Sequence, residues 1–258
     1  MSDGWRSESA LNGIKRMLAR RVVTRAAHVR VVSEPLKRSL VDRWGVDAAR
    51  ISVTPVGVNF QRSALSREES RRRLDPTLTD ERVVLFVGRL VAAKNLPLLL
   101  EVAKRVLSMH PATRFVLVGD GELRASTEAR ARELGISANV RFTGNRPHGE
   151  LPDVYAAADV FLLTSHYEGM PRVVLEAMLA ARPVVTTRVG GLEDLVIDGQ
   201  NGFLAARDDA ATLAARVCTL LADAPLAEEF GARGARLAEE RFGLPALADR
   251  IIDVWQRA

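Results

Sequence analysis

Residues 83–118 read VVLFVGRLVAAKNLPLLLEVAKRVLSMHPATRFVLV, an amphipathic segment between two short, continuously apolar runs. Runs such as VVLFV and FVLV are typical of strands buried on both faces, which occur in parallel sheets that helices cover. The segment between them predicts a helix over 96–109. The stretch therefore predicts an α/β fold with a doubly wound parallel sheet, rather than a barrel or a sandwich.

The same alternation continues toward the C-terminus. We predict strands at 83–87, 114–118, 140–142, 160–163, 183–186 and 202–204. Helices are predicted between them at 96–109, 122–134, 151–157 and 171–181. Three more helices, at 208–222, 226–241 and 244–256, should form a C-terminal helical layer, and the last begins at a proline that suits a first helical turn.

The N-terminal region is organised differently. We predict a basic helix at 11–27, a strand at 28–33, a helix at 34–45 and a strand at 51–56. These elements are too few for a second complete domain. Residues 61–79, rich in Arg, Ser and Glu, are predicted as a connector. We therefore expect a domain remnant at 1–60, a connector at 61–80 and a Rossmann-like domain at 81–258.

Composition limits the classes of partner. Hydrophobic residues make up 47% of the 258-residue chain and charged residues 27%, as in a soluble globular protein with a full core. The net charge of +5 suits nucleic acid, an anionic membrane or phosphate-bearing small ligands. With only 5% aromatic residues, a platform for stacking bases is disfavoured, so we expect no nucleic-acid partner.

Cysteine content and hydropathy bear on the compartment. Cys218 is the single cysteine, which excludes a disulfide within the chain and favours a reducing compartment. Neither an apolar run of membrane-spanning length nor the apolar core of a signal peptide is found in the sequence. We expect a cytoplasmic protein with at most peripheral contact to the inner membrane face.

The loop after the first predicted strand reads GRLVAAKN and carries two cations. Gly88 lets the backbone turn closely, and Arg89 and Lys94 lie beside the start of the next helix. A helix N-terminus attracts anions, and a guanidinium with an ammonium would complete a diphosphate site. Only four of the 37 basic residues are lysines, so Lys94 is less easily read as surface filler. The alternative is that both side chains are solvated loop cations.

Two further loops contain glycines but give weaker signals. Gly119 opens the stretch GDGEL, which lacks the third glycine of a dinucleotide fingerprint and reads mainly as a tight strand-to-helix turn. Gly190 and Gly191 follow the fifth strand, where backbone amides can approach a ligand or form an ordinary turn.

The strongest signal is TSHYEGMPRVVLEAM at 164–178, in which seven residues separate Glu168 from Glu176. Glu168 lies in the turn before the helix, and Glu176 lies on the helix among apolar neighbours. A carboxylate buried there needs a protein donor or a ligand diol. Alone, Glu168 also fits a first-turn residue that complements the helix dipole, and Glu176 a buried salt bridge.

A metal site is not expected. The four histidines are scattered, and the sequence contains no Asp-x-Asp pair of the kind that holds a divalent cation at a phosphate. Catalysis in which Arg and Lys neutralise a leaving group is the consistent alternative.

At this point the sequence resembles glycosyltransferase family 4, of the GT-B fold, a group similar to the sucrose and glycogen synthases. The matching stretches are VVLFVGRLVAAKN, RFVLVGDGE, VRFTGN, ADVFLLTSHYEGMPRVVLEAM, RPVVTTRVGGLEDLV and NGFL, which cover 83–204. Upstream, RVVSEPLKRSL and ISVTPVGVN resemble the end of the family's N-terminal domain and its interdomain linker.

The resemblance implies a retaining, metal-independent transfer of a hexose from a nucleoside diphosphate sugar, with UDP or GDP as the nucleotide. Arg89 and Lys94 would bind the diphosphate, and Glu168 would bind sugar hydroxyls. The resemblance also implies sugar contacts from the backbone N–H groups of Gly169 and Met170. Glu176 would bind the ribose.

The resemblance places the remaining site residues as well. Asn145 and Arg146 would border the nucleobase, and Gly88 and Gly119 would lie against the donor. Two positions depart from the family pattern: Asp194 stands where Glu is usual, and Ala181 replaces a common Gly. Both leave the identity of the sugar open.

The largest departure is the missing N-terminal Rossmann domain, which in the family holds a glycan, lipid or small-molecule acceptor. We expect a truncated enzyme or one subunit of a split enzyme, with a homodimer or a partner subunit to complete it. The predicted strand at 28–33 would expose unpaired edges. The competing hypotheses are a nucleotide-sugar-binding module without turnover and, less favoured, a nucleic-acid-binding protein that uses the basic N-terminal helix.

Overall fold

The computed structural model describes residues 9–54, 57–78 and 80–243, together with Ala248, Ile251, Ile252 and Val254. The chain divides into two compact units. One comprises Met1–Gly57 and Arg241–Ala258, and the other comprises Val58–Glu240. The predicted helix at 244–256 lies largely outside the described residues.

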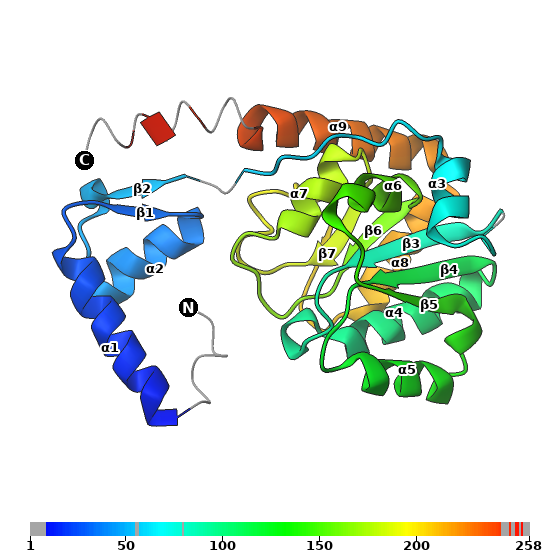
Figure 1. The fold of residues 1–258 in the computed structure, drawn as a ribbon, viewed down its shortest axis with the longest axis horizontal. Coiled ribbons are helices and arrows are strands. Elements are labelled where there is room, and N and C mark those ends of the chain that lie inside the picture. The colour runs from blue at the N-terminus through cyan, green and yellow to red at the C-terminus, as the bar shows by residue number, and fades with distance from the viewer. Residues whose placement is uncertain are drawn as a thin grey trace. The chain divides into compact units, whose positions relative to one another are not determined.

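The larger unit is built on a six-stranded parallel sheet with the order β5-β4-β3-β6-β7-β8 (Figure 1). The strands are β3 (Arg82–Val87), β4 (Thr113–Val118), β5 (Val140–Gly144), β6 (Val160–Leu163), β7 (Val184–Thr187) and β8 (Gly202–Ala205). The chain builds outward from β3 to β5, returns to β6 beside β3, and builds outward again to β8. The predicted doubly wound sheet is therefore confirmed, and its switch point lies between β3 and β6.

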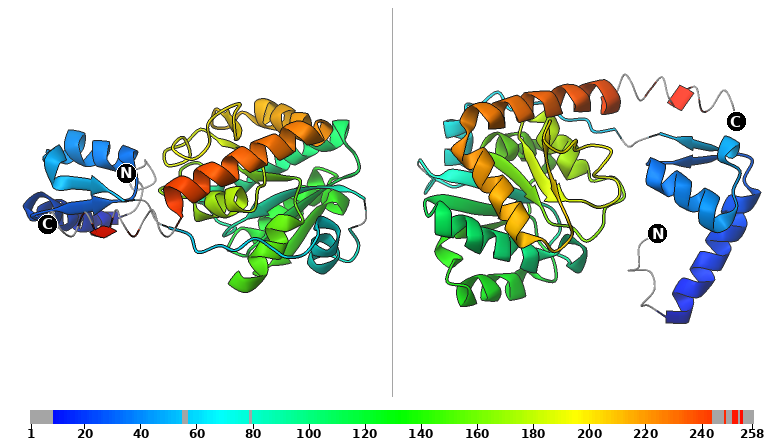
Figure 2. Two further views of the ribbon diagram at one scale, coloured as in Figure 1. Left: turned by 90° about the horizontal axis from the view of Figure 1, so that it is seen from above. Right: turned by 180° about the vertical axis from the view of Figure 1, so that it is seen from behind.

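Helices cover both faces of this sheet, as Figures 1 and 2 show. On one face, α4 (Leu96–Met109) contacts both α5 (Arg124–Glu133) and α8 (Ala210–Ala222). On the other face, α3 (Arg67–Leu74) contacts α6 (Leu151–Ala156), with α7 (Arg172–Leu179) beside them and α9 (Ala224–Phe242) following α8. Most residues of the two central strands are fully buried, which explains their unbroken apolar sequence.

The segment predicted only as a connector contains helix α3. A capping box starts this helix: Ser66 Oγ accepts from the Glu69 N–H, and the Glu69 carboxylate accepts from the Ser66 N–H. Arg71 then anchors the helix to the sheet, because its Nη2 lies 2.5 Å from Asp159 Oδ2 and its Nε donates to the Ala157 carbonyl. The composition of this segment gave no sign of a helix, because the buried face of the helix includes the charged Arg71.

The predicted helix at 171–181 ends earlier than expected, at Leu179. Ala181 has φ 54°, in the left-handed region, and its carbonyl lies where α9 passes. A Cβ added at Gly231 of α9 would lie 2.2 Å from this carbonyl oxygen. The turn between α7 and β7 therefore packs directly against the backbone of α9.

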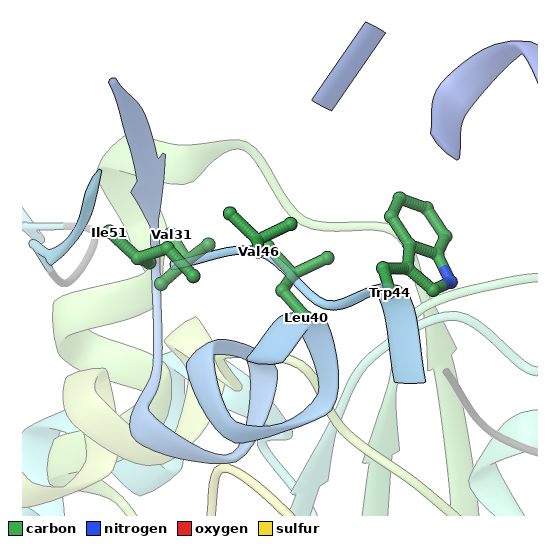
Figure 3. Close-up of a cluster of buried hydrophobic side chains, with 5 residues drawn as sticks. All are labelled: Val31, Leu40, Trp44, Val46 and Ile51. Carbon is green, nitrogen blue, oxygen red and sulfur yellow. The ribbon is translucent and has the colours of Figure 1, made fainter. Parts of the chain in front are cut away.

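The smaller unit consists of α1 (Ser9–Arg25), β1 (Val29–Val31), α2 (Glu34–Trp44), η2 (Ala48–Arg50) and β2 (Ile51–Val53). β1 pairs in parallel with β2, and within the described residues this sheet has only these two strands. Its core consists of Val31, Leu40, Trp44, Val46 and Ile51 (Figure 3). Gly45, at φ 70°, caps α2 and returns the chain toward β2.

Among the described residues, no single helix is long and apolar enough to cross a membrane; α8 and α9 meet the length and composition criteria only as a pair bent by 105°.

Candidate functional site

Three glycines bring the ends of β3, β4 and β5 together at the carboxyl edge of the sheet. The Gly88 N–H donates to the Val118 carbonyl, and the Gly119 N–H donates to the Gly144 carbonyl at 2.8 Å. Gly119 has φ 133°, and a Cβ there would lie 2.0 Å from the Gly88 carbonyl oxygen. Bare backbone therefore forms this part of the edge. Gly119 lies in a tight strand-to-helix turn, as one sequence interpretation held, and directly beside Gly88.

Lys94 lies at the end of η3 (Ala92–Lys94), immediately before α4. The next residue, Asn95, starts the helix: its side chain accepts from the Leu98 N–H and donates to Asp208 Oδ1 at 2.9 Å. A Cβ at Gly88 would lie 3.5 Å from Lys94 Cε, so the lysine stem passes directly over this glycine. These contacts fix the ammonium group at the sheet edge, next to the N-terminus of α4.

The Lys94 ammonium meets the Glu168 carboxylate. Nζ lies 2.5 Å from Glu168 Oε1, and Ser165 Oγ donates to the same oxygen at 2.6 Å. The two charged side chains are only 16% and 12% exposed, which strengthens their attraction relative to a surface pair. Two predicted site residues, 74 positions apart in sequence, thus form one charged centre.

Backbone contacts hold the two loops of this centre against each other. Thr164 Oγ1 donates to the carbonyls of Lys94 and Asn95, and the His166 N–H donates to the Ala93 carbonyl at 2.9 Å. The loops after β3 and β6 flank the switch point of the sheet, where open α/β sheets bind their ligands.

The loop containing Gly190 and Gly191 packs against the backbone of Glu168 and Gly169. Gly191 has φ 85°, and a Cβ there would lie 2.4 Å from the Gly169 carbonyl oxygen. Within the described part of the chain, the N–H groups of Gly169 and Met170 make no hydrogen bond. They remain available to a ligand.

Arg89 follows Gly88 and is exposed. Its guanidinium makes no hydrogen bond or ion pair with the residues that the structure describes. It is thus a second cation on the loop that carries Lys94.

Glu176 lies on α7 and is 4% exposed. Its Oε2 accepts a hydrogen bond of 2.9 Å from the hydroxyl of Tyr155, a fully buried side chain of α6. Burial raises the pKa of the Glu176 carboxyl, and the Tyr155 hydrogen bond and the charges of Arg172 and His148 oppose the rise. The partner that the sequence required is therefore a protein donor here, and the structure contains no direct contact between Glu176 and Glu168.

Tyr155 was not predicted as part of the site. Its only sequence signal is an aromatic hydroxyl within the otherwise small and apolar run VYAAA. Burial raises the pKa of Tyr155 further, so the hydroxyl stays a donor toward Glu176.

The residues predicted beside the nucleobase follow β5. Asn145 is exposed, and Arg146 donates from Nη2 to the Leu74 carbonyl at 3.3 Å and lies 3.5 Å from Glu150. Arg146 thus faces a small pocket of about 140 Å³ beside α3, and its described contacts do not include the Lys94–Glu168 pair.

No group of three or more His, Cys, Asp or Glu side chains suited to a metal ion is found among the residues with described positions.

Comparison with known proteins adds a family and its relatives. The model of a family described as glycosyl transferases group 1 matches residues 66–237. The D-inositol 3-phosphate glycosyltransferase of Thermomonospora curvata is 36% identical over 237 residues, which cover 86% of this chain and 54% of that protein. The Vi polysaccharide biosynthesis protein VipC/TviE of Salmonella typhi is 44% identical over 128 residues, which cover 49% of this chain and 21% of that protein.

Two solved structures are similar to this chain over nearly all of its length. HepE of Anabaena, in complex with UDP-glucose, has a TM-score of 0.85 at 26% identity and covers 97% of this chain and 69% of that one. Sucrose-phosphate synthase from Thermosynechococcus elongatus has a TM-score of 0.82 at 28% identity. The match covers 98% of this chain and 64% of the synthase chain. The chain spans little more than half the length of its D-inositol 3-phosphate glycosyltransferase relatives, at 54% and 58%.

Proposed function

Because the chain belongs to the family of glycosyl transferases group 1, we propose that it forms the donor-binding part of a glycosyltransferase. The enzyme would transfer a hexose from a nucleoside diphosphate sugar to a glycan, lipid or small-molecule acceptor, with retention at the anomeric carbon. Assignment to glycosyltransferase family 4 is part of this proposal. The observation that carries it is the Lys94–Glu168 pair at the switch point, beside free backbone N–H groups and the bare backbone of Gly88.

The ion pair suggests how the site responds to its donor. Without a donor, Lys94 and Glu168 neutralise each other at 2.5 Å. A bound diphosphate would attract Lys94 and Arg89, and sugar hydroxyls would donate to the released Glu168 carboxylate. The N–H groups of Gly169 and Met170 would contact the same sugar.

The remaining predicted residues would bind the nucleoside. Glu176 would accept from the ribose hydroxyls with the oxygen that does not bind Tyr155. Asn145 and Arg146 would border the base, and Gly119 would keep the floor of the site free of side chains.

We propose the following reaction. The bond between the anomeric carbon and the β-phosphate oxygen breaks, and its electron pair stays with the departing nucleoside diphosphate. Arg89 and Lys94 neutralise the charge that develops on this diphosphate, in the manner of preorganised electrostatic stabilisation. The acceptor oxygen bonds to the same face of the carbon, and its proton passes to the departing diphosphate. We propose that this transfer needs neither a metal ion nor a cofactor.

UDP is the nucleotide to test first, because HepE, at 26% identity, was solved with UDP-glucose. GDP is the alternative from the sequence. We propose that the acceptor is held by an N-terminal domain outside this chain, on a longer polypeptide or a partner subunit. Pairing with a second copy of this chain is the other proposed association. The expected location is the cytoplasm, with at most peripheral contact to the inner membrane face, in polysaccharide biosynthesis.

A second candidate is a nucleotide-sugar-binding module without turnover. Both hypotheses use the same donor site and predict the same nucleotide binding, so only a measurement of turnover separates them.

Titration calorimetry with UDP, GDP and ADP, with and without EDTA, tests the proposal. We expect UDP binding that EDTA does not change and that Lys94→Ala weakens at least tenfold, the effect of losing one charge-assisted hydrogen bond. Lys104→Ala is the matched control, because Lys104 is exposed and lies further along α4. No binding of any nucleotide, or equal binding by both variants, would refute the donor site. Donor turnover after addition of an N-terminal domain separates the enzyme from the binding module.

A further inference from the structure

A second pocket lies at the opposite edge of the large sheet from Lys94 and Glu168. Its lining includes Arg82, the first residue of β3, and Asp159 and Pro183, which immediately precede β6 and β7. In a parallel sheet, residues that precede strands lie at the edge opposite to those that follow them. The pocket has a volume of about 240 Å³, and apolar side chains of α8 and α9 form part of its wall.

Guanidinium groups outnumber carboxylates here. Asp159 is the buried carboxylate, and three arginines share it: Arg67 and Arg82 at Oδ1, at 3.2 and 3.4 Å, and Arg71 at Oδ2. Glu228, the other acid of the lining, is exposed at the rim and makes no ion pair with the described part of the chain.

Arg182 is the third arginine of the lining, after Arg67 and Arg82, whereas Arg71 binds Asp159 from outside the lining. Its Nη1 and Nε donate to the carbonyls of Ala158 and Ala180, both at 3.0 Å, and it forms no ion pair with a described acid, although the nearby Asp159 charge partly stabilises it. Burial, followed by the charge of Arg67, lowers the pKa of Arg182 to about 10. Such a shift means that the surroundings disfavour its charge, which a bound anion would relieve.

We propose that this pocket, which we name the arginine pocket, binds a phosphate monoester or inorganic phosphate. Arg67 and Arg82 each engage Asp159 through one nitrogen, so their planar forks keep further N–H donors for phosphate oxygens. The apolar wall of α8 and α9 suits the carbon skeleton of an ester. The volume limits this ester to a small one, since pockets for larger ligands start at roughly 300 Å³.

The arginine pocket is independent of the donor site in its residues, and its ligand would act on the fold differently. It joins α3, the turn between α7 and β7, and the junction of α8 with α9. An anion bound there would therefore stabilise the packing of three segments that meet around Asp159.

Calorimetry and thermal unfolding with inorganic phosphate and with glycerol 3-phosphate test the proposal. Because phosphate can also enter the donor site, the titrations use Lys94→Ala as the background. We expect both anions to bind there and to raise the Tm, and glycerol 3-phosphate to bind more tightly if the apolar wall contacts the ester.

Arg82→Gln and Arg67→Gln, two partly exposed arginines, should each weaken phosphate binding roughly tenfold, as expected for a charge-assisted hydrogen bond. Arg130→Gln, a comparably exposed arginine on α5, should leave it unchanged. If the Lys94→Ala variant with its native arginines does not bind phosphate, the proposal is overturned. Equal affinity in all three arginine variants would overturn it too. UDP binding by Arg82→Gln with Lys94 intact shows separately that the donor site is formed.

Discussion

Lys94 Nζ lies 2.5 Å from Glu168 Oε1, although the two residues belong to different loops on either side of the switch point. The loops are held together by Thr164 and His166, whose hydrogen bonds end on the backbone of residues 93–95. The two loops that carry the cation and the carboxylate are therefore held against each other before any ligand binds. Preorganisation of this kind lowers the cost of binding, because fewer groups must be ordered.

Glu168→Gln should separate the nucleotide from the sugar. The variant releases Lys94 from its competing carboxylate, so UDP affinity should hold or rise. UDP-glucose affinity should fall roughly tenfold, because a charged acceptor of sugar hydroxyls becomes a neutral one. Calorimetry with both ligands measures the difference, and Glu133→Gln, an exposed acid of α5, serves as the control. An equal loss for both ligands would show that Glu168 does not face the sugar.

Glu176→Gln should change how stability depends on pH. Burial raises the folded-state pKa of Glu176 above its ordinary value of 4.5, so the folded protein holds this proton more tightly than the unfolded chain. The stabilisation is fully present below pH 4.5 and is lost as pH rises through the raised pKa. The glutamine side chain does not titrate. The free energy of unfolding of the variant should therefore rise relative to that of the wild type as pH increases toward neutrality. Urea unfolding across this range gives the two curves, and parallel curves would contradict the raised pKa.

The chain contains two tyrosines, which give a matched pair of substitutions. Tyr155→Phe removes the described donor to a buried carboxylate and should cost about 1–3 kcal/mol at neutral pH. Tyr167→Phe should be nearly neutral, since Tyr167 is 47% exposed. Urea unfolding of both variants measures the difference. Equal stabilities would mean that the hydrogen bond contributes nothing.

The sequence predicted the sheet well because local patterning dictates it. β6 and most of β3 and β4 are continuous apolar runs, and all six predicted strands occur within one or two residues of their expected ends. Helix α3 escaped prediction because its buried face consists of Ser70, Arg71 and Leu74. Burial of the Arg71 charge is favourable because the Asp159 carboxylate neutralises it. That carboxylate lies 88 positions away in the sequence, so no local sequence pattern predicts the ion pair.

The candidate site shows the same division. Motif order and the rule that ligands bind beyond strand ends predicted that Lys94 and Glu168 would share an edge of the sheet. The position of Glu176 on an apolar helix predicted a buried carboxylate in need of a donor. The identity of that donor, Tyr155 on a neighbouring helix, depends on how α6 packs against α7, which the sequence alone does not specify.

Gly191→Ala should disturb the loop that carries Glu168. The new Cβ would lie 2.4 Å from the Gly169 carbonyl oxygen and would also require a residue with φ 85° to accept a side chain. We expect a loss of about 1–3 kcal/mol in stability, the range for strained backbone, and weaker binding of UDP-glucose. Gly149→Ala, where no atom lies within 4 Å of the added Cβ, should preserve both. Binding that survives intact in Gly191→Ala would show that the close approach is not needed by the site.

Asp159→Asn should destabilise the large unit more than any surface substitution. The carboxylate is 6% exposed, accepts the Val83 N–H at 2.7 Å and balances three guanidinium groups. The asparagine amide could still accept from the Val83 N–H. The substitution nevertheless removes the only buried negative charge of the described cluster, and the amide NH2 group would face a guanidinium cation. Breaking a buried pair in this way costs about 3–5 kcal/mol, a large share of the roughly 5–15 kcal/mol that stabilises a domain. Arg130→Ala, which breaks exposed pairs on α5, should cost under about 1 kcal/mol.

Urea unfolding measures the stability of both variants. A cost for Asp159→Asn as small as that of the control would mean that α3 does not depend on the Arg71–Asp159 ion pair. If the arginine pocket binds phosphate as proposed, added phosphate should restore part of the loss, because it supplies the missing negative charge to the same guanidinium groups.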